Sequence, residues 1–118
     1  MSTKEKLHKA NYLGELAEKH VQVEALKRGA EVYPNFIKVG KTDLILKIND
    51  KLYEFNVKCK QWDKKDKCWK AKNAWSVKPP QWPILVEIHS DHIEIKWPNQ
   101  WGKKNEYKCP PGLEDFWK

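Results

Sequence analysis

The stretch Thr42–Lys60, TDLILKINDKLYEFNVKCK, decides the fold of this chain, because it predicts two antiparallel strands joined by a tight turn. Asp43 opens an apolar run, Asn49-Asp50 supplies the residues of a hairpin turn, and a second strand follows over Leu52–Cys59. The period of two in that strand places Tyr53, Phe55, Val57 and Cys59 on one face, and Glu54, Asn56 and Lys58 on the other. We expect the first face to enter the core and the second face to carry the chemistry.

An amphipathic helix is predicted before this hairpin, over Tyr12–Arg28, with Gly29 ending it in the left-handed region. Glu31–Pro34 then predicts a short strand, and the loop Asn35–Lys41 leads to Asp43. The apolar stripe of the helix is formed by Leu13, Leu16, Ala17, His20, Val23 and either Ala25 or Leu26.

After the hairpin, the charged stretch Asp63–Lys72 predicts either a solvated loop or the start of a helix. We expect Pro79, Pro80 and Pro83 to interrupt regular structure. A second hairpin follows, with strands over Ile84–Ile88 and His92–Trp97 and Ser90-Asp91 at its turn. Gly112–Trp117 predicts a terminal turn of helix. The whole chain, 1–118, is expected to form one domain, with its core over about 10–97 and an irregular, Trp- and Pro-rich segment over 98–118.

This order of helix, strand, Asp-led strand, turn and polar-Val-Lys strand resembles the core of the PD-(D/E)XK, or restriction-endonuclease-like, nucleases. The run Leu13-Gly14-Glu15-Leu16-Ala17 is similar to a helix start in phage and bacterial members related to homing endonucleases and Holliday-junction resolvases. The resemblance covers residues 10–60. It implies an α/β fold in which the N-terminal helix packs on a mixed sheet, built from an antiparallel meander and a second hairpin.

The resemblance also implies an activity, which is Mg²⁺-dependent hydrolysis of DNA phosphodiester bonds, with Mn²⁺ able to substitute. Asp43 matches the metal-binding aspartate of the family and Lys58 matches its lysine, while Glu15 corresponds to an additional acidic residue at the metal site. Asn56 stands where Glu, Asp or Gln is usual, and its amide oxygen can still ligate Mg²⁺. The resemblance therefore implies Asp43, Asn56, Lys58 and Glu15 as catalytic residues, and Asp43, Asn56 and Glu15 as metal ligands.

Two features depart from the family pattern. Asn56 is neutral, and the helix between Glu15 and Gly29 is about one turn longer than in similar proteins. Three alternatives to a duplex endonuclease therefore stay open. These are a Holliday-junction resolvase acting in DNA recombination, a DNA-binding module of the same fold without catalysis, and a protein-interaction domain that uses a tryptophan-rich surface.

Charge favours a polyanionic partner. The chain carries 23 Lys and Arg against 16 Asp and Glu, a net charge of +7, and only Arg28 among these cations is arginine. Lysine-rich excess neutralises phosphates without reading bases, although a basic protein without such a partner has the same composition. Cutting both strands of duplex or branched DNA needs two active sites, so a homodimer is expected.

Cellular location and thiol chemistry follow from what the sequence lacks. It has no apolar run long enough to span a bilayer and no signal core at its start, so we expect a cytoplasmic protein of a bacterial or phage-infected cell. Three cysteines without CxxC spacing predict reduced thiols rather than disulfides. Together with His89 and His92 their spacing fits no compact zinc finger.

Seven tryptophans exceed what one small core needs. Trp62, Trp69 and Trp75 lie among lysines, a mixture that supplies backbone neutralisation and stacking on a nucleic-acid surface. The alternative is that these indoles cover the core, which is the role we expect for Trp82 and Trp97. The candidate DNA-binding residues are Lys60, Gln61, Trp62, Lys64, Lys65, Lys67 and Trp69.

Overall fold

A computed structural model of the chain describes residues 3–34, 42–70, 80–98 and 109–118, with the side chains of 3–11 left out. The predicted loop Asn35–Lys41 and Trp75 lie outside the described residues. The elements in chain order are α1 (Thr3–Lys27), β1 (Glu31–Pro34), β2 (Leu44–Ile48), β3 (Lys51–Asp63), β4 (Cys68–Lys70), β5 (Gln81–Ile88) and β6 (Ile93–Lys96).

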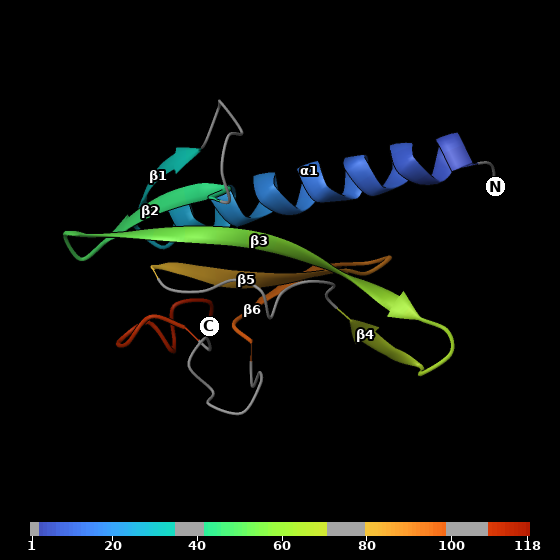
Figure 1. Cartoon of the computed structure of the whole chain (residues 1–118). Coiled ribbons are helices and arrows are strands. Elements are labelled where there is room, and N and C mark those ends of the chain that lie inside the picture. The colour runs from blue at the N-terminus through green and yellow to red at the C-terminus, as the bar shows by residue number, and fades with distance from the viewer. Residues whose placement is uncertain (1–2, 35–41, 71–79, 99–108) are drawn as a thin grey trace.

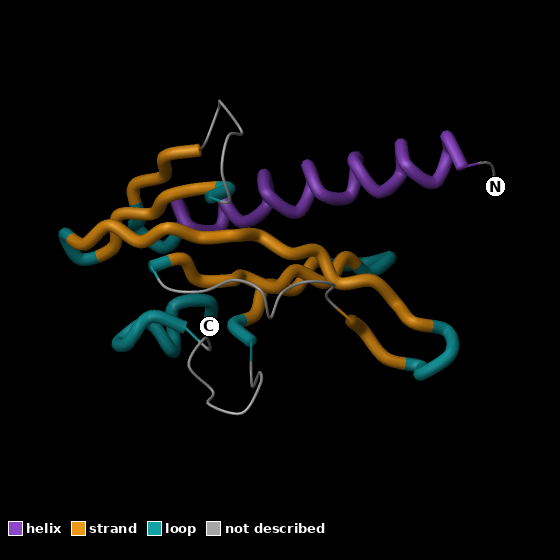
Figure 2. Tube along the Cα trace, in the orientation of Figure 1, coloured by secondary structure: helices purple, strands orange, loops and turns teal. Residues whose placement is uncertain are grey.

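The strands form one mixed sheet in the order β1-β2-β3-β5-β6 (Figure 1). β1, β2 and β3 make an antiparallel meander, β5 pairs with β3 in parallel, and β6 pairs with β5 antiparallel. β4 pairs only with the far end of β3, beyond the rest of the sheet (Figure 2). The predicted α/β class, with a helix on a mixed sheet built from a meander and a second hairpin, is confirmed.

Two short signals in the sequence set the geometry of the first half of the chain. Asn49 and Asp50 both have positive φ, 52° and 66°, between the paired residues Ile48 and Lys51, as a two-residue hairpin turn of the mirror-image type requires. At the end of α1, Gly29 has a φ of 88°, and the Ala30 amide donates to the Ala25 carbonyl at 3.0 Å. This hydrogen bond satisfies one of the last carbonyls of the helix, and the chain then turns toward β1.

The buried stripe of α1 differs from the predicted one. Ala17, Val21 and Ala25 enter the core at four-residue spacing, whereas Val23 and Leu26 are half or more exposed. The two small alanines let the helix lie close to the sheet, so small residues rather than the large apolar ones mark the inward side. α1 also begins about nine residues before the predicted start at Tyr12. No helix in the described part of the chain is both long and apolar enough to cross a membrane.

The core lies between α1, the C-terminal turns and one face of the sheet. Phe55 is fully buried, with Tyr53, Val57 and Cys59 packed around it, so the inward face predicted for β3 is confirmed. Trp82 and Trp97 also pack on the core, as predicted. At the C-terminus, the Trp97 indole N–H donates to the Leu113 carbonyl at 2.9 Å.

Three expectations for the second half of the chain are wrong. Asp63–Lys72 is neither a plain loop nor the start of a helix: β3 continues to Asp63, and β4 returns along it over Cys68–Lys70. Pro83 is buried inside β5. Among the described residues, β6 pairs with β5 only from Leu85 onward, so Pro83 has a strand neighbour there on one side only, where proline is tolerated. The end of the chain, residues 111–117, forms turns and no helix.

Candidate active site and nucleic-acid-binding face

The candidate active site lies where β2 and β3 separate. Their last paired residues are Leu44 and Phe55, and just before them the Asp43 amide still donates to the Phe55 carbonyl at 3.0 Å. The Val57 amide of β3 donates to the Asp43 carboxylate at 2.7 Å. A side chain thus takes the place of the missing strand partner, which fixes the carboxylate at the opening of the sheet.

Asn56 and Lys58 follow on the same strand, on the face opposite the core. Asn56 is 9% exposed and lies beside Pro83 of β5, while Lys58 is half-buried and lies beside Leu85. The register places Asn56 next to Asp43 across the β2–β3 opening. The structure therefore places Asp43 beside Asn56 at this opening, and Lys58 lies two residues further along the same face of β3.

Glu15 occupies an exposed position of α1, the element that packs against the other face of β3. It lies in the interior of a helix that begins at Thr3, so Gly14-Glu15 is not a helix start. The role of Glu15 as a metal ligand stays a prediction.

A polar cluster that the sequence did not single out borders this site. The Gln81 amide donates to the Thr42 hydroxyl at 2.8 Å, and that hydroxyl donates to the Glu54 carboxylate at 3.0 Å. Glu54 shares the Asn56 face of β3, so a second carboxylate lies two residues from the neutral position. The alternation of Glu54 with Asn56 is visible in the sequence, but the hydrogen bonds from Gln81 to Thr42 and from Thr42 to Glu54 depend on how the strands pair.

The donor set suits a hard cation. Asp43 and Glu54 offer carboxylate oxygens and Asn56 offers an amide oxygen, the atoms that Mg²⁺ prefers, and no sulfur or imidazole is among these three. The residues present therefore fit the metal that the family resemblance implies.

Further along β3, Lys60 is held in an ion pair with a buried carboxylate. The Lys60 ammonium lies 3.0 Å from Glu87, whose side chain is 7% exposed, and Lys96 approaches the same carboxylate at 3.6 Å. Burial opposes ionisation of Glu87, but the hydrogen bond and charge of Lys60, with the charge of Lys96, lower the pKa of Glu87 overall. Lys60, predicted to contact DNA, is thus mostly engaged within the sheet.

A row of aromatic rings begins where β3 leaves the sheet. Trp62 and Trp69 meet edge to face at 5.9 Å, Trp69 contacts the His89 ring at 4.7 Å, and His89 stacks on His92 at 4.4 Å. Trp62 is 51% exposed. The row therefore runs from the β3–β4 hairpin to the turn between β5 and β6 and presents ring surface to solvent.

Exposed lysines flank this row at the β3–β4 turn. Lys64, Lys65 and Lys67 are exposed, as is Gln61. Lys70 instead bonds Asp66 and lies 3.2 Å from Asp63. The predicted DNA-binding residues therefore gather at one end of β3, apart from the candidate catalytic residues at the β2–β3 opening.

Comparison with known proteins places the fold. No protein-family model and no curated protein sequence matches the chain. Among solved structures, a bacterial homing endonuclease, I-Ssp6803I, matches with a TM-score of 0.54 over 80% of this chain, at 19% sequence identity. The match spans 64% of that protein's chain.

The two chains thus share an architecture in which a helix packs on a mixed α/β sheet. The fold class defined by this arrangement is an α/β fold with one helix packed on a mixed sheet.

Proposed function

We propose that this protein is a metal-dependent DNA endonuclease of the PD-(D/E)XK type. The observation that carries the proposal is the position of the Asp43 carboxylate, which accepts a hydrogen bond of 2.7 Å from the Val57 amide at the opening of the sheet. Asn56 and Lys58 lie on either side of Val57 in β3. The structural likeness to a homing endonuclease supports the same class of activity.

In this proposal the chain's own groups divide the work of hydrolysis. Asp43 and Asn56 would hold Mg²⁺, with Glu15 or the nearby Glu54 as a further carboxylate; the ion would lower the pKa of water and offset phosphate charge. Lys58 would hold or deprotonate the attacking water and add positive charge beside the scissile phosphate. The other face of β3 packs on the core through Phe55 and Val57, so Asn56 and Lys58 would keep their spacing during the proposed reaction.

The length of β3 relates the two regions to a DNA substrate. Lys58 and Trp62 are four residues apart on one strand, about 13 Å at 3.3 Å per residue. That is about four base steps of duplex at 3.4 Å each. A DNA strand that is cut beside Lys58 would therefore reach the row of aromatic rings a few nucleotides from the scissile bond.

The exposed Trp62 favours branched or locally unpaired DNA over intact duplex as the substrate. An indole that is 51% exposed offers a face on which an unpaired base can stack, while a single arginine limits bidentate reading of guanine. A Holliday-junction resolvase of the same fold is thus the second candidate, and in either case two copies of the chain would cut the two strands.

Cleavage assays on four substrates in parallel test the proposal: a supercoiled plasmid, a synthetic four-way junction, a linear duplex with the sequence of its arms, and single-stranded DNA, each with Mg²⁺, with Mn²⁺ and with EDTA. We expect cleavage only with the metals, and faster cleavage of the junction than of a linear duplex of the same arms. Binding without cleavage of any substrate would instead identify a non-catalytic DNA-binding module. Neither binding nor cleavage would favour a protein-interaction domain.

A further inference from the structure

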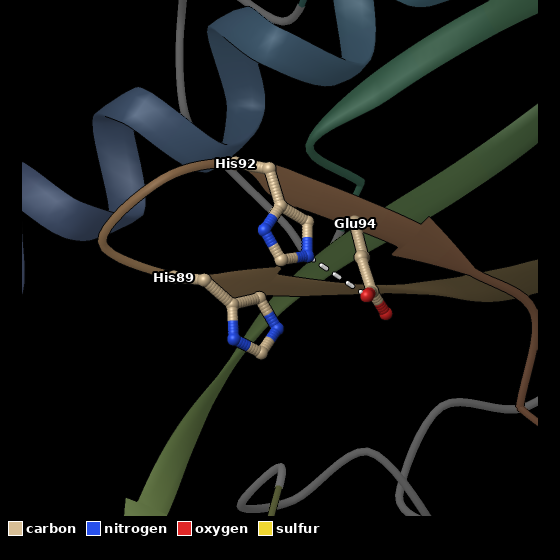
Figure 3. A group of neighbouring side chains, drawn as sticks. All are labelled: His89, His92 and Glu94. Carbon is tan, nitrogen blue, oxygen red and sulfur yellow. Dashed lines mark hydrogen bonds and ion pairs between the residues drawn. The ribbon is translucent and has the colours of Figure 1, made fainter.

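We propose a second metal site, for a transition-metal ion such as Zn²⁺, Ni²⁺ or Cu²⁺, formed by His89, His92 and Glu94 at the turn between β5 and β6. One ligand atom from each of these three residues lies within 4.8 Å of the others. Figure 3 shows both imidazoles and the carboxylate turned toward the same space. Two imidazoles and one carboxylate are a donor set typical of zinc and related metals rather than of Mg²⁺.

The hairpin itself positions the donors. The His89 amide donates to the His92 carbonyl at 2.9 Å, so the two histidines face each other across the short Ser90-Asp91 turn. Their rings are parallel within 3° and stacked at 4.4 Å. Glu94 is two residues beyond His92 on the same face of β6, and its carboxylate already lies 2.9 Å from His92 Nε2.

To bind one ion, the His92 ring must turn out of its stack on His89, because the nitrogen lone pairs of two parallel rings do not point at one position. Metal–nitrogen bonds of about 2.0–2.1 Å in a tetrahedron place neighbouring donors about 3.3 Å apart. The present limit of 4.8 Å leaves about 1.5 Å to close, which rotation of the half-exposed His92 imidazole and of the Glu94 side chain supplies. A water molecule or the neighbouring Glu87 carboxylate, 3.2 Å from His89 Nε2, would complete the coordination.

The groups that would orient these ligands are also in place. Asp91 lies 2.6 Å from His92 Nδ1, so it can hold that nitrogen protonated and direct Nε2 to the ion. The Trp69 ring against His89 limits the rotation of that imidazole. In the described residues, this group of donors contains no cysteine, so the site is unlike the cysteine-containing zinc finger that the sequence spacing already disfavours.

Calorimetric titration of the EDTA-treated, dialysed full chain with Ni²⁺ at mildly alkaline pH tests the site. We expect one equivalent to bind, with His89→Ala and His92→Ala each weakening binding at least about tenfold, and Asp91→Asn weakening it by a smaller factor. His20→Ala is the matched control, because this histidine lies on α1 outside the cluster. Asp43→Asn should also leave Ni²⁺ binding unchanged, which separates this site from the proposed catalytic one.

Electron paramagnetic resonance of the wild-type protein with one equivalent of Cu²⁺ gives a readout that needs no variant to fold. Hyperfine coupling to two imidazole nitrogens is expected. A thiolate spectrum, a spectrum with one nitrogen, or Ni²⁺ binding that survives in a folded His89→Ala/His92→Ala double variant would overturn the proposal.

Discussion

The two ends of β3 are built differently, and the difference matches the separate roles that we propose for them. At the β2–β3 opening, Asp43 is fixed by a main-chain amide and Asn56 is nearly buried above a packed core. At the other end, Trp62, Trp69 and the neighbouring lysines lie on a two-stranded extension held by ring contacts and exposed ion pairs. Rigid positioning suits chemistry at a single phosphate, whereas an exposed, adaptable surface suits binding of a polymer.

The largest effect should separate catalysis from binding. Asp43→Asn and Lys58→Met are expected to lower the rate of Mg²⁺-dependent cleavage by about 10²–10⁴-fold, because both groups act at the reacting phosphate in the proposed mechanism. Their DNA affinity should stay within a few-fold of wild type. Single-turnover cleavage and a binding titration on the same DNA check both statements, and wild-type cleavage by either variant would remove these residues from the active site.

The choice of asparagine matters, because Asp43 has a structural role as well. Asp43→Ala would leave the part-buried Val57 amide without this acceptor, which should lower the folding stability by about 1 kcal/mol, the lower end of the range for buried donors. Asp43→Asn keeps an oxygen at the same place. Denaturant unfolding of the two variants should therefore show the alanine variant to be the less stable.

Neutralising the lysines at the far end should change affinity alone. The triple variant Lys64→Gln/Lys65→Gln/Lys67→Gln is expected to weaken binding of all DNA sequences alike. The slope of log affinity against log salt should fall by about 0.9 for each duplex phosphate that the variant no longer neutralises. The matched control replaces three exposed lysines elsewhere, Lys19, Lys27 and Lys51, with glutamine. An unchanged slope in the first triple variant would place the binding face elsewhere.

Removing an indole should discriminate among DNA structures. Trp62→Ala is expected to weaken branched or unpaired substrates by about 1–3 kcal/mol per stacked base, and intact duplex by less. Leu52→Ala, at the opposite end of the same strand and 66% exposed, is the control for removal of an exposed apolar side chain. Equal weakening on junction and duplex DNA would mean that Trp62 contacts backbone rather than bases.

The structure around Asp43 could be predicted from the sequence better than the β3–β4 hairpin could. Asp43, the Asn49-Asp50 turn and the alternation around Phe55 are local signals, and each has its expected position in the structure. The β3–β4 hairpin is not predicted, because its charged turn resembles a solvated loop. In the structure the Lys65 amide donates a hydrogen bond to the Asp63 carboxylate at 2.8 Å. An aspartate that bonds the backbone two residues later is a turn signal, and the sequence does contain it.

Contacts between distant residues need the register and could not be predicted. Gln81 and Thr42 are 39 residues apart in sequence, and their hydrogen bond follows from the parallel pairing of β3 with β5. The contact of Trp69 with His89 likewise depends on where β4 folds back.

Replacing the neutral Asn56 with a carboxylate tests whether this residue belongs to the proposed metal site at the β2–β3 opening. Asn56→Asp should tighten Mg²⁺ binding severalfold, since a charged oxygen attracts a hard cation more strongly than an amide oxygen does. Glu54→Gln, two residues earlier on the same face, should weaken Mg²⁺ binding if this carboxylate compensates for the neutral Asn56. Isothermal titration with Mg²⁺ measures both, and unchanged affinity in both variants would place the metal outside this cluster.

The last prediction concerns the ion pair that joins β3 to β5 between these two regions. Glu87→Gln removes the charge that holds Lys60 at 3.0 Å and should lower the free energy of unfolding at pH 7 by about 1–3 kcal/mol. Because the pKa of Glu87 is lowered in the folded protein, its contribution is complete above the ordinary carboxyl pKa of about 4.3 and is lost as the pH falls through the lower folded value. The wild type and the variant should therefore differ in urea unfolding at neutral pH and converge in acid. Glu114→Gln, an exposed carboxylate near the C-terminus, is the control and should change stability little at either pH. A difference that persists unchanged in acid would mean that packing of the Glu87 side chain, and not its charge, stabilises the middle of β3.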